Sequence, residues 1–219
     1  MTGTKPTWQR ARRPEQISQR ISRILDATGE LFGEMPYDHV TMQLIAKRAN
    51  FTRSNLYRYF RSREEIFLAL LRFDMEIWMN EILSVFSQTI SVPIESFVTS
   101  WTDILFRRKR LLRLLPLISL SLEKNVSENV YRDFKTSLND MTCEVIPVIG
   151  NTLSECDEDQ IGAFLLFNLA LVAGAWPMSQ YSFMQRSVLN DPELAWMKVD
   201  FKDFFRKSIA AYLRGTLQR

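Results

Sequence analysis

Residues 41–60 bring together side chains that can hydrogen-bond to nucleic acid. The stretch reads Thr-Met-Gln-Leu-Ile-Ala-Lys-Arg-Ala-Asn-Phe-Thr-Arg-Ser-Asn-Leu-Tyr-Arg-Tyr-Phe. Arg53 and Asn55 carry the side chains whose donors and acceptors match the major-groove edges of guanine and adenine. Tyr57 and Arg58 are suited to phosphate oxygens. The chemistry that these residue types indicate is recognition of duplex DNA.

Two short helices joined by a tight turn would position these side chains. Thr41 is the expected N-cap of the first helix, which ends near Asn50, a residue type that tolerates positive φ. Thr52 is the expected N-cap of a second helix that runs to about Phe60. This is the helix-turn-helix arrangement. Its second helix is expected to turn five polar or aromatic side chains outward: Arg53, Ser54, Asn55, Tyr57 and Arg58.

The charge distribution agrees with a polyanionic partner for the first part of the chain. Residues 1–65 contain 12 Lys and Arg against 7 Asp and Glu, whereas residues 66–219 contain 16 against 18. A basic front on a slightly acidic body favours binding of nucleic acid. On spacing and charge alone, two amphipathic helices of an ordinary bundle with a solvated charged face remain an equal alternative.

The rest of the 219 residues predicts an all-α protein with about nine helices. Apolar residues recur at helical spacing from Ile17 to Phe32, and Ser62 with Glu65 forms a capping-box pattern before another helix to about Gln88. No later stretch alternates as a strand would. Further helices are expected at 93–107, 110–122, 127–149, 157–180 and 200–216. We divide the chain into a flexible basic arm (1–16), a helix-turn-helix domain (17–62) and a second domain (63–219).

The residue inventory excludes several kinds of site. The chain has two cysteines, Cys143 and Cys156, and one histidine, His39, so it lacks the residues for a disulfide framework, a zinc site or a two-histidine metal motif. It also contains no P-loop and no nucleophile elbow. We expect no catalytic residue, no metal and no cofactor, and therefore no enzyme. Because no apolar segment precedes Gln16, we expect a cytoplasmic protein.

Residues 160–185 carry no charge, which raises the question of a membrane span. Gly162, Asn168 and Pro177 interrupt the stretch, and no cluster of Lys or Arg flanks it. We therefore favour a helix buried on all sides, against its own core and a partner subunit, over a membrane helix.

The front of the chain resembles the DNA-binding domain of the TetR family of transcriptional regulators. The resemblance covers about a quarter of the chain, in the ordered set Ile24-Leu-Asp-Ala-Thr-x-x-Leu-Phe, Tyr37, Thr41-Met-x-x-Ile-Ala, Ala49 to Phe60, and Ser62-Arg-Glu-Glu-Ile-Phe-Leu. It implies that Thr41 and Gln43 contact phosphates and that residues 52–55 approach bases. It further implies phosphate contacts for Tyr57, Tyr59 and Arg63, the last at a position where the family usually has lysine. Asn50, Ser54 and Tyr59 depart from the family's common residues, which leaves the base preference open.

The resemblance also implies a C-terminal helical bundle that binds an effector and forms a homodimer. We expect the dimer to form through residues 157–180 and 200–216 and to bind a near-palindromic site on double-stranded DNA. An effector pocket is expected among the bulky apolar residues, with Trp101, Phe134, Phe167 and Trp176 as candidates. The expected function is a repressor released by a small apolar or aromatic effector. The alternative is a DNA-binding protein of the same fold without a small effector, acting through a protein partner.

Overall fold

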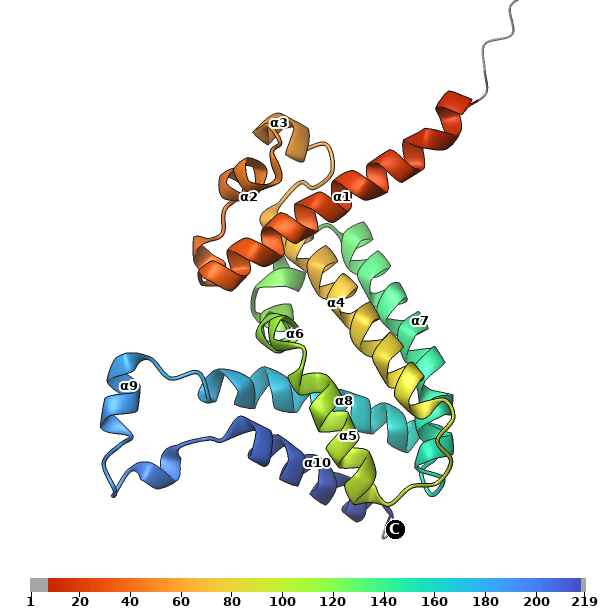
Figure 1. Cartoon of the computed structure of the whole chain (residues 1–219), viewed down its shortest axis with the longest axis vertical. Coiled ribbons are helices and arrows are strands. Elements are labelled where there is room, and N and C mark those ends of the chain that lie inside the picture. The colour runs from red at the N-terminus through yellow and green to blue at the C-terminus, as the bar shows by residue number, and fades with distance from the viewer. Residues whose placement is uncertain (1–7, 218–219) are drawn as a thin grey trace, which may run out of the picture. The chain divides into compact units, whose positions relative to one another are not determined.

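The computed structural model describes residues 8–217, and side chains over 14–216. Helices are the only regular secondary structure in this described part, as the sequence predicts. The chain divides into two compact units, Met1–Leu70 and Leu71–Arg219. Figure 1 labels the α-helices of both units.

The first unit is a small helical domain built on an amphipathic helix. It contains α1 (Trp8–Glu34), a 3₁₀ turn η1 (Tyr37–His39), α2 (Met42–Ala49), α3 (Arg53–Leu56) and the start of α4 (Arg63–Phe86). Apolar residues three and four apart on each helix face one interior. Its fully buried members are Ile24, Val40, Ile45, Leu56, Ile66 and Phe67.

The turn between α2 and α3 has the geometry that the sequence predicts. Thr41 Oγ1 accepts a hydrogen bond from Leu44 N at 3.3 Å, and Thr52 Oγ1 accepts one from Asn55 N at 3.2 Å. Asn50 lies in the left-handed region at φ 60°. The amide of Phe51 then reaches the carbonyl of Ala46 at 2.8 Å, the bond of a Schellman motif. These local bonds fix where α2 stops and α3 starts.

Two predicted boundaries in this unit are wrong. The α-helical part of α3 is one turn long and gives way after Leu56 to successive hydrogen-bonded turns that end at Phe60. α1 begins at Trp8, so residues 8–16, placed in the flexible arm, continue that helix instead. Pro14 does not prevent this, although a proline inside a helix removes one backbone hydrogen bond. Residues 1–7 of the predicted arm lie outside the described residues.

The start of α4 differs in detail from the predicted capping box. Ser62 Oγ accepts a hydrogen bond from Glu65 N at 3.1 Å, as expected. The Glu65 carboxylate accepts from Arg61 N at 2.7 Å, one residue before the position that a capping box would use. Glu65 is nevertheless buried, so this charge-assisted bond satisfies an otherwise costly carboxylate.

The second unit packs the remainder of α4 with six further helices. These are α5 (Ile94–Phe106), α6 (Lys109–Leu114), α7 (Glu128–Thr152), α8 (Glu158–Met178), α9 (Phe183–Val188) and α10 (Phe201–Leu217). α8 and α10 lie side by side, and α5 packs on α10 (Figure 1). The sequence predicts α5, α7, α8 and α10 within a few residues but misses α9.

The helix predicted at 110–122 is interrupted. α6 ends at Leu114, and a π-helical segment η2 (Ile118–Leu122) and a 3₁₀ turn η3 (Glu123–Asn125) follow it. π-helical turns are uncommon in proteins, and those that occur often lie at functional sites. Ile118 of this segment lines the cavity described below.

Aromatic rings form the interior of the second unit. Trp101, on α5, is completely buried and stacks on Phe97 with the ring centroids 5.5 Å apart. Its Nε1 donates to Oδ1 of buried Asn168, on α8, at 2.9 Å. This hydrogen bond joins residues 67 positions apart, and it explains why an amide is present in the uncharged stretch.

The basic residues at 107–110 hold α4 through ion pairs. Arg107 and Arg108 both pair with Glu81, the first at 2.5 Å. Arg110 makes a two-pronged contact with Asp74, at 2.6 and 2.7 Å. Asp74 is 7% exposed, so the guanidinium compensates a carboxylate that would otherwise be costly to bury.

The segment 179–200 leaves apolar side chains uncovered. It carries α9 and a 3₁₀ turn η4 (Ala195–Met197) between α8 and α10. Phe183 is 90% exposed and Trp196 is 77% exposed. The segment is tied to itself, because Tyr181 Oη accepts from Val199 N at 2.6 Å and Lys198 Nζ donates to Asn190 Oδ1 at 2.8 Å.

α8 is long and apolar enough to cross a membrane by length and composition. Its most apolar window has a mean hydropathy of 1.8, and 28% of that window is buried within the chain. A single chain therefore buries only part of this helix, and burial of the remainder against a partner subunit stays a prediction. Ala163, Leu166, Ala170 and Gly174 are exposed, at a spacing that places them along one side of the helix.

Candidate DNA-binding surface and ligand cavity

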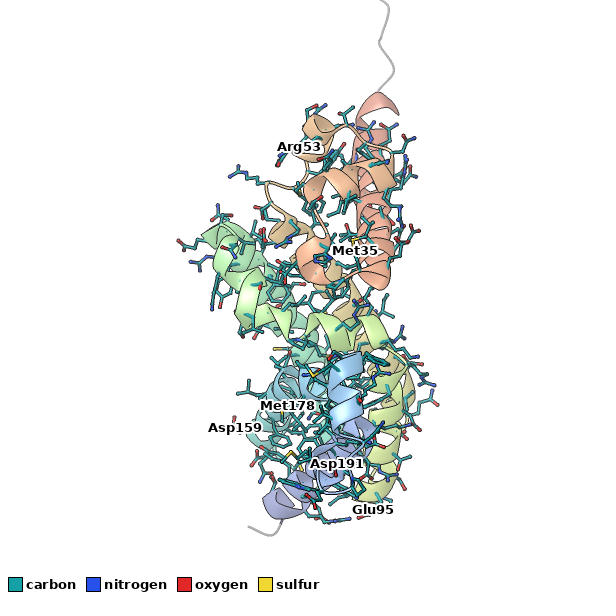
Figure 2. The ribbon with its side chains drawn as sticks, turned by 90° about the vertical axis from the view of Figure 1, so that its left-hand side faces the viewer. Met35, Arg53, Glu95, Asp159, Met178 and Asp191 are labelled. Carbon is teal, nitrogen blue, oxygen red and sulfur yellow. The ribbon has the colours of Figure 1, made fainter. Side chains whose placement is uncertain are left out.

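α3 presents a polar surface at its N-terminal end. Thr52, Arg53 and Ser54 are exposed, and Arg53 lies at the outer edge of the first unit (Figure 2). The hydroxyl oxygens of Thr52 and Ser54 are 3.3 Å apart. Thr52 also caps the helix through Oγ1, so it positions the α3 backbone as well as lying on this surface.

Arg53 and Tyr57 form a pair one helical turn apart. Arg53 Nη2 donates to Tyr57 Oη at 3.3 Å, and the guanidinium carbon lies 5.6 Å from the centroid of the Tyr57 ring. Tyr57 is 41% exposed. The hydroxyl keeps its own proton for a phosphate oxygen while the guanidinium holds it in place. Arg58, the next residue, is exposed.

Asn55 does not lie open with its neighbours, contrary to the prediction. The residue is half-buried, and its Oδ1 is buried without a hydrogen-bond donor among the described residues. A buried acceptor of this kind costs free energy. Base contact through Asn55 Oδ1 would therefore require this oxygen to turn outward.

Thr41 and Gln43 lie at the opposite end of the motif, at the start of α2. Both are exposed. Thr41 Oγ1 is engaged as the helix cap, while its hydroxyl proton is available to an acceptor. The first turn of α2 contains no acidic side chain. This N-terminus therefore offers amide protons and two polar side chains to an anion.

Tyr59 is hydrogen-bonded to Arg20, a residue that the sequence does not indicate as part of the site. Arg20 Nη1, on α1, donates to Tyr59 Oη at 2.9 Å. Gln16, Ile17 and Arg58 complete the lining of a surface hollow around this pair. Two guanidinium groups and a phenol in one hollow can bind a phosphate. No local pattern could have found Arg20, because 39 residues separate it from Tyr59.

Arg63 binds backbone and side-chain groups of the protein itself, whereas the resemblance implies a contact with phosphate. Its Nη1 donates to the carbonyls of Tyr37 and Val40, both at 3.2 Å, and its Nη2 donates to the Glu64 carboxylate at 3.1 Å. The guanidinium carbon also lies 4.2 Å from the centroid of the Tyr37 ring. Arg63 thus ties η1 to α4, and its donors are largely occupied. Nearby His39 is exposed at the end of η1.

The second unit contains an apolar cavity of about 220 Å³. Its walls come from α4, α5, η2, α7, α8 and the residues beside α6. The lining residues are Met75, Trp78, Met79, Leu105, Leu115, Ile118, Leu138, Thr142, Gly162, Leu165, Leu166, Asn168, Leu169 and Val172. A cavity of this kind is the usual form of a small-molecule site.

None of the four predicted pocket residues lines this cavity. Trp101 and Phe134 are buried in the packed core. Phe167 stacks on Tyr212 with the centroids 4.5 Å apart, and Trp176 packs edge-on against Phe201. The large rings are engaged with one another, while the space lies beside leucines, methionines and Gly162. Trp78 is the only aromatic residue among the lining residues.

Two family models match the chain along its two units. The model of bacterial regulatory proteins of the tetR family matches residues 24–70, and that of a tetracyclin repressor-like C-terminal domain matches residues 68–219. The chain belongs to the TetR family. It is therefore a transcriptional regulator with a helix-turn-helix DNA-binding domain, which confirms the resemblance seen in the sequence.

Curated relatives of this TetR-family chain are similar over part of their length. An uncharacterized HTH-type transcriptional regulator of Mycobacterium tuberculosis is 35% identical over 105 residues, which are 48% of this chain and 49% of that protein. The regulator RutR of Escherichia coli is 29% identical over 68 residues, 31% of this chain and 32% of RutR. The chain thus spans at most about half the length of these curated relatives.

Solved structures agree with the fold over nearly the whole chain. The fatty acid degradation regulator FadR from Bacillus halodurans has a TM-score of 0.57 at 16% identity, covering 91% of this chain and 97% of FadR. A TetR transcriptional regulator from Rhodococcus sp. RHA1 has a TM-score of 0.55 at 19% identity, covering 93% and 97%. At these identities the likeness establishes the all-α fold.

Proposed function

We propose that this TetR-family regulator is a homodimeric repressor that a small, mainly apolar effector releases from a near-palindromic operator. In this mechanism the effector binds better to a dimer whose recognition helices no longer fit both half-sites. The protein would act in the cytoplasm. Thr41, Gln43, Arg53, Tyr57 and Tyr59 would contact the DNA, with Arg20 and Arg58 beside them.

The observation that carries this proposal is the continuity of α4. This helix runs without interruption from Arg63 to Phe86. In the first unit its residues Ile66 and Phe67 are fully buried in the helix-turn-helix core. In the second unit its residues Met75, Trp78 and Met79 line the apolar cavity. A ligand that displaces α4 in the cavity would act on the same helix whose Phe67 packs against Phe32 and Tyr37 in the first unit.

The dimer is proposed through α8 and α10. The uncovered side of α8 combines small residues with Leu166, which is 67% exposed. On α10, Phe204 is 45% exposed. An apolar surface of this kind is typical of an interface between subunits. Covering it with a second copy would also explain a helix that is uncharged over its whole middle.

An apolar effector is supported by the walls of the cavity, which carry no charged side chain. FadR from Bacillus halodurans, a protein of the same fold, is described as a fatty acid degradation regulator. A cationic effector would find no carboxylate in this lining.

One observation favours the alternative in which a protein partner replaces the small effector. Segment 179–200 holds its own shape while exposing Phe183 and Trp196. Such ordered apolar side chains are suited to contact with another protein. The alternative predicts that regulator and DNA stay together when any small molecule fills the cavity.

Fluorescence anisotropy with labelled DNA tests the proposal. The probe is the intergenic DNA beside the regulator's own gene, titrated with protein over a range of salt and with excess unrelated duplex present. We expect binding that survives the competitor, weakens steeply with salt and requires two half-sites. A cavity ligand should then lower the DNA affinity by at least tenfold. Binding to the operator that no cavity ligand alters would overturn the effector part and leave the protein-partner alternative.

A further inference from the structure

α3 carries two side chains of the types that can read a base pair through two hydrogen bonds. An arginine matches the O6 and N7 acceptors of guanine, and an asparagine matches the N7 acceptor and the N6 donor of adenine. Arg53 and Asn55 are the residues of these types on α3. The base that α3 can recognise therefore depends on which of the two has both of its groups accessible.

Asn55 does not offer both of its polar groups to adenine. Its Oδ1 is buried and has no donor among the described residues. Adenine recognition requires this oxygen to accept from N6 while the amide nitrogen donates to N7. Exchanging the oxygen and the nitrogen would bury the donor instead, so one half of the pair is lost in either orientation. A single amide donor does not identify adenine, because both purines carry an N7 acceptor.

Arg53 has the donors that Asn55 lacks. It is exposed at the outer edge of the first unit (Figure 2). Within the described residues its side chain donates one hydrogen bond, from Nη2 to Tyr57 Oη at 3.3 Å. A guanidinium has five N–H donors, so four are left, and guanine requires two of them. The first turn of α3 contains no acidic side chain that would compete for these donors.

Other arginines of the first unit are occupied by the fold. Arg48 pairs with Glu30 and Glu34, at 3.2 and 2.7 Å. Arg23 Nη2 donates to the carbonyl of Ala49 at 3.1 Å. These guanidinium groups hold α2 against α1, whereas the guanidinium of Arg53 contacts only its own helix and the turn that follows it.

Contacts within this segment restrict the Arg53 side chain. Its guanidinium carbon lies 5.6 Å from the centroid of the Tyr57 ring. Leu56, which precedes that tyrosine, is completely buried, and Thr52 caps the helix through Oγ1. Both ends of α3 are thus anchored in the first unit. A side chain that is restricted before binding loses less conformational entropy when it binds.

From the open guanidinium of Arg53 and the buried amide oxygen of Asn55, we infer that each operator half-site contains a G·C pair that Arg53 reads in the major groove, and that Asn55 does not read adenine. This inference rests on the proposed operator binding and names the base that it requires. In helix-turn-helix proteins the first residues of the recognition helix contact base edges. Thr52 and Ser54, the other polar residues there, carry hydroxyls, which do not select one base.

Substitution of single base atoms tests the inference. The operator is obtained first, by selection from a pool of random duplexes with the full-length protein. Each guanine of the selected site is then replaced, one at a time, by 7-deazaguanine, and each adenine by 7-deazaadenine, which removes the N7 acceptor and keeps the base pair. Inosine is the control for guanine, because it keeps O6 and N7 and lacks only the minor-groove amino group.

Fluorescence anisotropy gives the dissociation constant of every duplex for wild type, Arg53→Ala and Asn55→Ala. The matched control is Arg58→Ala, the same change at another exposed arginine, four residues from Ser54. All titrations use one salt concentration, low enough for Arg53→Ala to bind, with excess unrelated duplex present.

We expect 7-deazaguanine at one position of each half-site to weaken wild type about 5- to 30-fold, and inosine there to change the affinity less than about twofold. Arg53→Ala should bind the guanine and 7-deazaguanine duplexes within about twofold of each other, because the guanidinium that would lose a bond is absent. Arg58→Ala should bind every duplex more weakly and keep the full effect of 7-deazaguanine. Asn55→Ala should respond to 7-deazaadenine as wild type does, within about twofold.

A selected half-site without a G·C pair would overturn the inference. So would effects of 7-deazaguanine that persist in Arg53→Ala at every position, which would make Arg53 a phosphate contact. An effect of 7-deazaadenine that is present in wild type and lost in Asn55→Ala would show that Asn55 reads adenine, contrary to the inference.

The proposed function fails through different outcomes. Selection of a single half-site that shows the guanine effect of Arg53 contradicts the homodimer alone. A near-palindromic site that a cavity ligand releases, but that shows no guanine effect of Arg53, contradicts the inference alone. Selection that yields no preferred sequence contradicts both.

Discussion

At the scale of single residues, the proposed DNA-binding surface contains side chains that hold one another in place. Arg53 donates to the Tyr57 hydroxyl, and Arg20 does the same for Tyr59. In each pair the guanidinium leaves the phenolic proton free to point at an acceptor. Both tyrosines thus present a donor of fixed direction, next to a positive charge that attracts phosphate.

Replacing Tyr57 with Phe should lower operator affinity about 3- to 10-fold, because one hydrogen bond to phosphate is lost. The melting temperature should not change, since the hydroxyl is exposed and Leu56, beside it, fills the core. Anisotropy titrations at fixed salt measure the effect. The matched control is Tyr131→Phe, an exposed tyrosine of α7 in the second unit. Unchanged affinity in Tyr57→Phe would remove this hydroxyl from the interface.

Ionisation of Tyr37 at alkaline pH lowers the stability of the first unit. Burial, reinforced by the Glu64 carboxylate, raises the pKa of Tyr37 to about 12. Its hydroxyl donates to Glu64 at 3.1 Å, and this bond requires the proton. An unfolded tyrosine ionises near pH 10. The stabilisation is therefore complete below about pH 10 and is lost as the pH rises toward 12.

We expect the free energy of unfolding to fall by up to about 2 kcal/mol from this residue between pH 10 and 12. Urea titrations of wild type and Tyr37→Phe measure it. The variant should be less stable at pH 8, and the difference should shrink as the pH rises, since phenylalanine has no proton to lose. Tyr131→Phe should follow wild type throughout. A constant difference between Tyr37→Phe and wild type would show that the Tyr37 pKa is not raised.

At the scale of elements, the turn after α2 depends on an asparagine in a strained conformation. Asn50 adopts φ 60°, where a Cβ is unfavourable and glycine is favoured. The Schellman bond from Phe51 to Ala46 requires this conformation. Asn50 thus sets the angle at which α3 follows α2.

Asn50→Gly should raise the free energy of unfolding by up to about 1 kcal/mol, and Asn50→Ala should lower it by about 1 kcal/mol. Thermal unfolding followed by circular dichroism compares the two variants. The control is Asn139, an exposed asparagine inside α7. There the order should be reversed, because alanine is the better residue in a helix interior. The same order at both positions would contradict a left-handed Asn50.

The elements that the sequence predicts correctly are those fixed by neighbouring residues. Thr41, Asn50 and Thr52 act within four residues of their own positions, so their caps and the turn could be read from the chain. The short length of α3 could not, because the tyrosines that follow it have ordinary helix propensity and give no local stop signal. α9 has a local signal, the capping box of Ser182 and Gln185, but its apolar residues are exposed and give no pattern of a buried face.

The ligand cavity shows where sequence reasoning fails for a site. The sequence predicts Trp101, Phe134, Phe167 and Trp176 as pocket residues because they are large and aromatic. Large rings fill space, however, and a cavity forms where smaller or flexible residues leave it. Which of many leucines and methionines face one another is decided by contacts across several helices.

At the scale of the whole molecule, α8 has an apolar side that a single chain leaves open. Leu166 on α8 and Leu120 on η2 are 67% and 68% exposed, so they form a matched pair for a test of assembly. Glutamate at an interface between two copies places like charges in an apolar contact. The same substitution on a free surface costs little.

Leu166→Glu should therefore convert the proposed dimer to a monomer, and Leu120→Glu should not. Sedimentation velocity measures the state of each variant. Operator affinity should fall at least about 100-fold for the monomer, because one subunit holds one half-site and loses the effective concentration of the second. A Leu166→Glu protein that sediments as a dimer would place the interface elsewhere.

Segment 179–200 is the covalent connection between α8 and α10 in the second unit. Tyr181 and Val199 are joined by a hydrogen bond at its base, and Asp191, labelled in Figure 2, lies exposed far along it. The backbone between α8 and α10 therefore carries little of the packing that holds these two helices together. A cut near Asp191, or a foreign domain inserted there, would leave both helices anchored in their core. The hydrogen bond between Tyr181 and Val199 joins the two ends of the segment, so the residues between them can be replaced without disturbing α8 and α10.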